Sequence, residues 1–235
     1  MAQKTVIVTG ASQGIGAAVL QAFLHRGYNV VATSRSIVNA GLAPSPNLAL
    51  VDGDIGQPAT AEKVARTAVE KFGAIDHVVN NAGIFSSKPF IDYTADEFHA
   101  FVSTNLEGFI FITQLAVRQM LSQGTGGSVT SITASLVGSP IAGLPASIPM
   151  ITKGGIDAIT LSLASEYAKN NIRFNTVAPG VVETPLHGGT PKPRSAMGTI
   201  SQPRDIAEAV VYLTEASHVT GEVLHVDDGA HVGQL

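Results

Sequence analysis

Short apolar runs alternate along the chain with stretches whose apolar residues recur at helical spacing. The short runs predict buried strands, and the longer amphipathic stretches predict helices. Strand-like runs occupy residues 6–8, 28–33, 48–51, 75–79, 128–133, 172–177 and 222–226. Helix-like stretches follow at 15–26, 58–72, 94–123, 153–169 and 203–213, whereas 37–47 is a polar connection without clear periodicity.

The first strand-like run leads directly into a glycine turn and then into a helix. The turn reads Thr9, Gly10, Ala11, Ser12, Gln13, Gly14, Ile15 and Gly16. The N-terminus of a helix presents free backbone N–H groups and a positive partial charge, which together favour phosphate. Glycine suits positions where the backbone adopts a positive φ or approaches a ligand closely. An isolated turn of this kind can also be an ordinary tight turn, but the order strand, turn, helix favours a phosphate site.

Strands joined by helices imply a parallel sheet with helices on both faces, because such crossovers are right-handed. No repeat, linker or low-complexity tract divides the sequence. We therefore predict an α/β fold, a Rossmann-type doubly wound parallel sheet of about seven strands. Residues 1–235 are expected to form a single dinucleotide-binding domain, with a short substrate loop at about 185–202.

Composition narrows the expected partners. Only 14% of the residues are charged and 45% are hydrophobic, so we expect part of the surface to be buried against other subunits. The net charge of −4 gives no reason to expect nucleic acid or an anionic membrane as a partner. Cysteine is absent, no His/Asp/Glu spacing indicates a metal site, and neither a signal peptide nor a membrane-spanning run is evident. A cytoplasmic protein is the default expectation.

Several separate motifs occur in a fixed order over almost the whole chain. They are the glycine turn, Asp54 after the third strand, Asn80-Asn81-Ala82-Gly83, Asn105, Pro179-Gly180, Thr184, and the terminal Asp227-Asp228-Gly229. In this combination the chain resembles the short-chain dehydrogenase/reductase family. The resemblance implies an oxidoreductase that uses a nicotinamide dinucleotide, acts on a small-molecule substrate and forms a homo-oligomer, a dimer or, more usually, a tetramer.

The resemblance also implies where the cofactor lies. Gly10, Gly14 and Gly16, with the neighbouring turn residues Ser12, Gln13 and Ile15, would hold the pyrophosphate. Asp54 and Ile55 would contact the adenine, and Asn81, Ala82 and Gly83 would lie beside a ribose. Pro179 and Gly180 would turn the chain under the nicotinamide, with Val182 and Thr184 at its carboxamide. Turn chemistry is the alternative for Asn80 and Asn81, because asparagine tolerates a left-handed backbone.

The end of the second strand predicts which dinucleotide is used. An acidic residue there would bind the ribose hydroxyls of NAD and repel a 2′-phosphate. The sequence has Thr33, Ser34, Arg35 and Ser36 instead, and Arg35 with the two serine hydroxyls suits a phosphate. We therefore favour NADP(H) over NAD(H). Gln13 weakens this prediction, since many NADP-dependent relatives have a basic residue in the turn, and Arg35 as a solvated loop residue is the alternative.

The family's catalytic group is only partly matched. Lys153 stands at the lysine position, where it would bind the nicotinamide ribose, and Asn105 would hold a water against it. Ser135 is the preferred catalytic serine, with Thr133 as the second choice. Ser135 as ordinary loop polarity is the alternative. Lys153 and Asn105, together with Ser135, are therefore the expected catalytic residues.

Pro149 stands four residues before Lys153, where the family has its proton-donating tyrosine. Proline has no proton to give, and a positioned general acid is typically worth about 10²–10⁴-fold in rate. Near the start of a helix proline does no harm, because its missing N–H needs no partner there, and Ser147 is a possible N-cap. The four tyrosines, at 28, 93, 167 and 212, are far away in the sequence.

Two functional hypotheses remain open. The first is an oxidoreductase whose proton comes from water held by Lys153 and Asn105, from Ser135, or from the substrate, which would be a carbonyl/alcohol or a related C=C or C=N compound. His187 is a further possible acid or simply a solvated residue. The second is a catalytically impaired nucleotide-binding protein with a sensing or scaffolding role.

Overall fold

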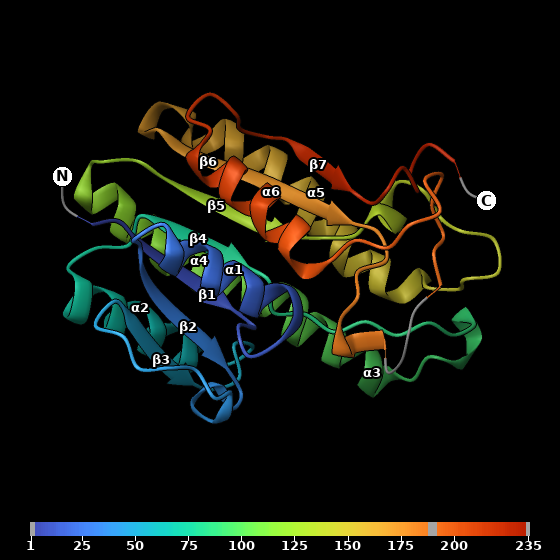
Figure 1. Cartoon of the computed structure of the whole chain (residues 1–235), viewed down its shortest axis with the longest axis horizontal. Helices are drawn as coiled ribbons and strands as arrows, with labels where there is room; N and C mark the ends of the chain where they lie inside the picture. The colour runs from blue at the N-terminus through green and yellow to red at the C-terminus, as the bar shows by residue number, and fades with distance from the viewer. Residues whose placement is uncertain (1–2, 188–191, 234–235) are drawn as a thin grey trace.

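Apolar β-branched residues dominate the strands, as expected for strands buried on both faces of a parallel sheet. The computed structural model describes residues 3–187 and 192–233. Its strands are β1 (Thr5–Thr9), β2 (Asn29–Ser34), β3 (Leu48–Asp52), β4 (His77–Asn80), β5 (Gly127–Ile132), β6 (Ile172–Pro179) and β7 (Val223–Val226). They form one seven-stranded sheet in the order β3-β2-β1-β4-β5-β6-β7 (Figure 1). Every neighbouring pair is parallel, which confirms the predicted doubly wound α/β fold.

Helices cover both faces of this sheet. The α-helices are α1 (Gly14–His25), α2 (Pro58–Phe72), α3 (Ala95–Phe101), α4 (Gly108–Gln123), α5 (Ser147–Tyr167) and α6 (Pro203–Glu215). Figure 1 shows α1 and α6 together in front of the sheet. Their buried side chains share one core cluster, whereas those of α2, α4 and α5 share the cluster on the opposite face.

Short helical turns connect these elements. The 3₁₀ turns are η1 (Ile37–Asn39), η2 (Phe90–Asp92), η4 (Ser135–Val137), η5 (Ala168–Asn170) and η6 (Pro185–His187). Residues Val102–Glu107 form a π-helix, η3, between α3 and α4. The expected capping box is present at α3, where Thr94 and Glu97 bind each other's backbone N–H groups. The helical stretch predicted for 94–123 is therefore continuous but contains a wider turn that periodicity alone did not predict.

Helix α5 begins at Ser147, so Pro149 lies in its first turn as expected, although the clearly periodic stretch of the sequence begins only at Lys153. Ser147 is the first helical residue, and Ala146 occupies the N-cap position without a side-chain hydrogen bond. The interpretation of Ser147 as the N-cap is therefore wrong.

The helical stretch Ala95–Gln123 satisfies the length and composition of a membrane span, with a mean hydropathy of 1.3 over its most apolar window. It reaches this length only because α3, η3 and α4 follow one another without a break. Phe109, Ile112 and Met120 lie in the core cluster on one face of the sheet. This packing is that of a core helix and gives the stretch its apolar character.

Candidate functional site

A cleft of about 1070 Å³ extends along the carboxyl ends of the strands. It crosses the point between β1 and β4 where the strand order reverses, which is where open α/β sheets bind ligands. Its lining includes every residue predicted to contact the cofactor, namely Gly10, Ser12, Gln13, Gly14, Ile15, Gly16, Ser34, Arg35, Ser36, Asp54, Ile55, Asn81, Ala82, Gly83, Lys153, Pro179, Gly180, Val182 and Thr184. The fold thus gathers these residues, from the ends of five strands and from α5, at one surface.

The glycine turn forms one wall of the cleft. Gly10 has φ +65°, and a Cβ atom there would lie 2.8 Å from Ala82 Cα. At Gly16 a Cβ atom would lie 2.2 Å from the Gly10 carbonyl oxygen, so a side chain would push the turn away from α1. Gln13 precedes α1 and makes no capping hydrogen bond within the described chain, and the first turn of α1 carries no acidic residue. The start of α1 therefore retains its positive character toward the cleft.

Hydrogen bonds tie the glycine turn to the end of β4. Thr9 Oγ1 accepts from the backbone N–H groups of Asn81 and Ala82, at 3.1 and 3.0 Å. The Asn81 Nδ2 amide donates to the carbonyl oxygens of Thr9 and Gly10, at 2.9 and 3.1 Å. Asn80 turns the other way and donates to Thr113 Oγ1 in α4 at 3.0 Å. The side-chain amide of Asn81 therefore stabilises the glycine turn, and Asn81 also lines the cleft.

The end of β2 carries the polar residues predicted to select the dinucleotide. The Ser34 hydroxyl is buried and has no hydrogen-bond partner among the described residues. Arg35 and Ser36 are exposed beside it. After the neighbouring strand β3, Asp54 Oδ1 accepts from Gly56 N at 3.0 Å, and Ile55 is buried. This end of the cleft therefore combines the Ser34 hydroxyl, which has no partner among the described residues, with the exposed guanidinium of Arg35. It also holds the Asp54 carboxylate, which is hydrogen-bonded within its own loop.

The chain leaving β6 forms the opposite wall. Pro179 ends the strand, and Gly180 lies so close to β7 that a Cβ atom would meet Asp227 Cα at 2.8 Å. Val182 is buried and pairs with Ser201 in an isolated parallel bridge. Thr184, on this wall, lies close to the glycine turn, because a Cβ atom at Gly14 would come within 3.2 Å of Thr184 Cγ2.

Lys153 lies at the floor of the cleft, 9% exposed, and Nζ donates to the Ile132 carbonyl oxygen at 2.7 Å. Burial lowers the pKa of Lys153 to about 8, and the charge of Asp157, one turn further along α5, opposes this shift. Burial also raises the pKa of the Asp157 carboxyl. A Cβ atom at Gly83 would lie 3.2 Å from both Lys153 Nζ and Asn105 Oδ1. Glycine at this position therefore lets the lysine and the asparagine approach the end of β4.

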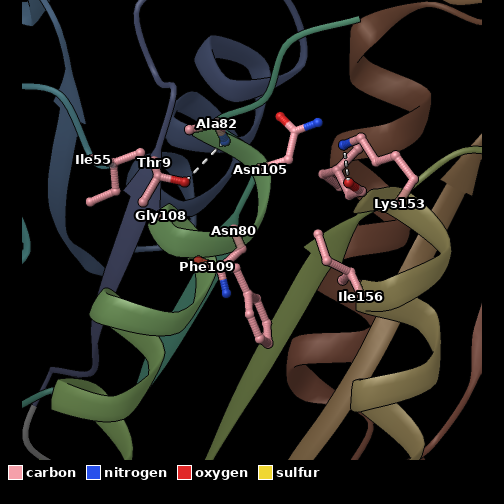
Figure 2. A pocket seen from close by; sticks show the side chains of 10 residues that line it. Thr9, Ile55, Asn80, Ala82, Asn105, Gly108, Phe109, Lys153 and Ile156 are labelled. Atoms are coloured by element: carbon pink, nitrogen blue, oxygen red, sulfur yellow. Dashed lines mark hydrogen bonds between the residues drawn. The ribbon is translucent and has the colours of Figure 1, made fainter. Parts of the chain in front are cut away.

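Asn105 reaches the site from the π-helix. Its Oδ1 accepts from Ile84 N at 2.9 Å, and its Nδ2 donates to Thr152 Oγ1 at 2.9 Å. Asn105 does not line the main cleft but a smaller cavity of about 10 Å³ beneath it, which Lys153 and Asn80 also border (Figure 2). A cavity of this size with several polar groups suits about one water molecule.

Pro149 is buried in the first turn of α5, and its carbonyl oxygen accepts from Thr152 Oγ1 at 2.9 Å. Ser135 is buried at the start of η4 and lines the cleft, as does Thr133. None of the four tyrosines, all within the described chain, is part of this lining. His187 belongs to η6, but its side chain lies outside what the structure describes.

The cleft also contains residues that were not among the predicted cofactor or catalytic residues. They are Gly53, Ile84, Phe85, Ser87, Thr104, Ile132, Ala134, Leu136, Ile141, Leu144, Val181 and Ala230. Thr33 also lines it, as do Pro185, Leu186, Lys192 and Arg194 from the loop expected beside the substrate. Many follow β4, β5 and β6, where the family motifs end and the connections are irregular. The only available signal was position, since residues that follow a strand's carboxyl end tend to line such a cleft. Within residues 3–187 and 192–233, no three His, Asp or Glu side chains are grouped so as to hold a metal ion.

A family model described as Enoyl-(Acyl carrier protein) reductase matches residues 10–231. The chain belongs to the short-chain dehydrogenase/reductase family. Across 247 residues it is 33% identical to an L-rhamnose 1-dehydrogenase (NAD(P)(+)) of Sphingomonas sp. (strain SKA58), covering 97% of this chain and 96% of the relative. It is 36% identical to a 3alpha-hydroxysteroid dehydrogenase of Mediterraneibacter gnavus, covering 97% and 96%. The relatives of this short-chain dehydrogenase/reductase are thus oxidoreductases.

Solved structures of the family have the same fold. A 3-ketoacyl-(acyl-carrier-protein) reductase from Brucella melitensis, complexed with NADH, superposes with a TM-score of 0.91 at 28% identity. The alignment covers 98% of this chain and 99% of that structure. Family membership therefore accounts for the whole seven-stranded sheet.

Proposed function

We propose that this chain is an NADP(H)-dependent oxidoreductase with an atypical proton relay. The proposal rests chiefly on one observation: the glycine turn and Lys153 lie along the same cleft. A turn suited to phosphate thus lies in the same cleft as the buried Lys153, the residue that would bind the nicotinamide ribose. Residues 1–235 then act as one dinucleotide-binding domain, with the segment at about 185–202 beside the substrate.

The cleft fits the pyrophosphate of a dinucleotide. Gly10 and Gly16 bring the backbone so close together that only hydrogen fits at these two α-carbons. Beside them, the uncapped start of α1 offers its N–H groups to an anion. Ser12, Gln13, Gly14 and Ile15 complete the cradle. The anion is held by the main chain, so its binding depends on backbone shape more than on side-chain charge.

The end of β2 favours NADP(H) over NAD(H). The buried Ser34 hydroxyl lacks a partner among the described residues, and it would donate a hydrogen bond to a phosphate oxygen. Arg35 supplies a planar fork of donors suited to the same phosphate, and Ser36 a further hydroxyl. Residues 33–36 include no acidic side chain, and the neighbouring Asp52, which pairs with Ser34 across the sheet, accepts a hydrogen bond from Val38 N at 3.1 Å. Asp54 and Ile55 would contact the adenine.

The far end of the cleft fits a nicotinamide riboside. Lys153 and the Asn81–Gly83 segment would flank the ribose, and Pro179 and Gly180 would pass beneath the ring. Val182 and Thr184 would contact the carboxamide. When bound, the reduced cofactor supplies the hydride. These residues act by orienting the ring against a substrate, and effective molarities from such orientation are large.

The proton would come from Lys153. Its Nζ lies at the cleft floor beside Asn105 and borders a cavity suited to one water, through which it could be reprotonated. An ammonium group whose pKa is lowered to about 8 is a usable acid near neutral pH. Ser135 would hold the substrate oxygen. Asn105 would keep the water beside Lys153.

Pro149 takes the place of the family's tyrosine in this proposal. Its buried ring offers no hydrogen-bonding group, so the substrate has less assistance at its oxygen. A small carbonyl/alcohol pair remains the expected substrate, and a C=C or C=N compound also suits such a site. The test is NADPH oxidation with a panel of ketones, aldehydes, enones and imines. NADPH consumption with formation of reduced product is expected, and no turnover with bound NADPH would contradict it.

The buried Pro149 also favours a second candidate function. A nucleotide-binding protein without turnover would keep the cradle and Lys153 but would not need a proton donor. Such a protein would sense or scaffold through its nucleotide-bound state. The Pro149→Tyr variant described below separates the two candidates, because only a site otherwise arranged for hydride transfer gains activity from a restored hydroxyl.

We further propose that the protein is a homo-oligomer. The outward faces of α4 and α5 expose Ile110, Leu121, Ile151 and Leu161, and only 14% of the residues in the chain are charged. A dimer or tetramer would bury them. Sedimentation analysis is expected to give a dimer or larger species, and a monomer would contradict it. A cytoplasmic location is proposed with it, and neither nucleic acid nor membrane is an expected partner.

A further inference from the structure

Part of the cleft is left over when the proposed cofactor residues are set aside. This part, called here the substrate half, is lined largely by side chains that follow β4, β5 and β6. Its apolar wall consists of Phe85, Leu136, Ile141, Leu144 and Leu186. Such a wall fits the hydrocarbon body of a ligand, because burial of apolar surface is the main non-directional contribution to binding.

The charged groups of the substrate half are all cations. Lys192 and Arg194 lie in its lining, on the chain segment that follows η6. Across the whole lining the single carboxylate is Asp54, at the opposite, adenosine end. The chain as a whole carries a net charge of −4, so this concentration of positive charge is a local feature. Within the described chain, the ion pairs formed at 4.0 Å or less involve other side chains.

The neutral hydrogen-bonding side chains of the same region are four hydroxyls, those of Ser87, Thr104, Thr133 and Ser135. Thr133 Oγ1 donates to the Val177 carbonyl oxygen at 3.4 Å. Ser87 Oγ donates to the Pro145 carbonyl oxygen at 2.8 Å and is therefore already engaged. Ser135 lies beside the proposed reaction centre and has a role there. A polyhydroxylated ligand would leave most of its hydroxyl groups unpaired against the apolar wall, and buried unpaired groups cost binding free energy.

From this arrangement we propose that the substrate is a hydrophobic oxo or hydroxy compound that ends in a carboxylate. Lys192 and Arg194 bind the carboxylate, and the apolar wall holds the hydrocarbon body. The reactive carbon then lies near Ser135 and Lys153. In reduction the carbonyl carbon gains the hydride of NADPH and its oxygen gains one proton, which leaves a hydroxy acid and NADP⁺. The inference rests on the proposed function and adds to it the class of substrate.

Three probes of equal length test the charge preference. Decanoate, decanamide and decylamine share a hydrocarbon chain and differ in the charge of the end group. Each is titrated into the NADP⁺-loaded protein by calorimetry. Decanoate is expected to bind at least about tenfold more tightly than decanamide, because hydrogen bonds to ionised groups are about twice as strong as neutral ones. Decylamine is expected to bind most weakly. Equal affinities for the three probes would overturn the proposal.

A paired variant locates the preference. The double variant Lys192→Ala/Arg194→Ala should lose the preference for decanoate while retaining its affinity for NADP⁺. The matched control is Lys63→Ala/Arg66→Ala, which removes one lysine and one arginine from the exposed face of α2 and should behave as wild type. If Lys192→Ala/Arg194→Ala keeps the preference for decanoate, these two cations do not bind the substrate carboxylate and the assignment is overturned. Loss of NADP⁺ affinity in this variant would also overturn it.

The same titrations separate this inference from the proposed function. If NADP⁺ fails to bind the wild-type protein, the proposed function fails. The decanoate titration is then made on the cofactor-free protein, where the preference and its loss in the double variant decide the inference alone. Should the alanine variant not fold, as judged by circular dichroism, Lys192→Gln/Arg194→Gln replaces it with the same expected result.

Discussion

Asn105 Nδ2 donates a 2.9 Å hydrogen bond to Thr152 Oγ1, and this hydroxyl donates in turn to the Pro149 carbonyl oxygen at 2.9 Å. The π-helix η3 is thereby fastened to the first turns of α5, directly beside Lys153. Thr152 is fully buried, so the chain of hydrogen bonds is shielded from water. Thr152 acts here as a positioning residue for Asn105, and through it for the small polar cavity.

Removing this link should be measurable as stability. Thr152→Val keeps the shape of the side chain but leaves the Asn105 amide with one partner fewer. A buried donor left unpaired costs about 1–3 kcal/mol, so we expect the free energy of unfolding in urea to fall by an amount in this range. Thr152→Ser keeps the hydroxyl and should retain most of the bond. Equal stability of the valine and serine variants would show that the link is not important.

Arg35 should determine dinucleotide choice. Arg35→Ala removes the cation proposed to bind the 2′-phosphate, so NADPH affinity should fall by about tenfold, while NADH affinity should change little. Fluorescence titration of each reduced dinucleotide measures this. Arg204→Ala, an exposed arginine on α6, is the control and should leave both affinities unchanged. An equal loss for NADPH and NADH in the Arg35 variant would refute the role given to this side chain.

Restoring a hydroxyl at position 149 should raise activity. Pro149→Tyr places a phenol one turn before Lys153, whose positive charge would lower the phenol's pKa. Ketone reduction by NADPH should increase by about a hundredfold, the lower part of the range for a positioned general acid. Pro149→Phe provides the same bulk without the hydroxyl and should not gain. If the tyrosine variant is folded, binds NADPH and gains nothing, the nucleotide-binding alternative is the better account.

The pH dependence should report the ionisation of Lys153. The protonated amine is the form that gives a proton in reduction, and its pKa is lowered to about 8. Reduction should therefore be fastest below this pH and decline as the pH rises through it. In Lys153→Arg the guanidinium stays protonated, so any residual activity should lose this decline. A flat profile in the wild type across the same interval would exclude Lys153 as the proton source.

The fold was largely predictable because its signals are local. Strands such as 6–8 and 48–51 are apolar runs bounded by polar residues, and the capping box at Thr94 fixes the start of α3. The parallel topology then follows from the alternation of strands and helices. Most residues proposed to contact the cofactor share a cleft because they lie at or just after the end of a strand, a relation that sequence order already contains; Lys153, in α5, is the exception.

Other features depend on contacts between distant segments and were not predictable. Ala146 rather than Ser147 holds the N-cap position of α5, one residue before the cap suggested by the sequence. The π-helix that turns Asn105 toward Thr152 has no periodic signature. The engagement of the Asn81 amide by the glycine turn requires β1 and β4 to be neighbours. Lys192 and Arg194 fall in the loop expected beside the substrate, but which of its side chains line the cleft is seen only in the folded chain.

The central claim is that the cleft binds NADP(H), and calorimetric titration of the wild-type protein with NADPH and then with NADH tests it most directly. We predict one NADPH bound per chain, with an affinity at least about tenfold higher than that of NADH. No measurable binding of either dinucleotide would contradict the claim altogether. Tighter binding of NADH would contradict the role given to the end of β2.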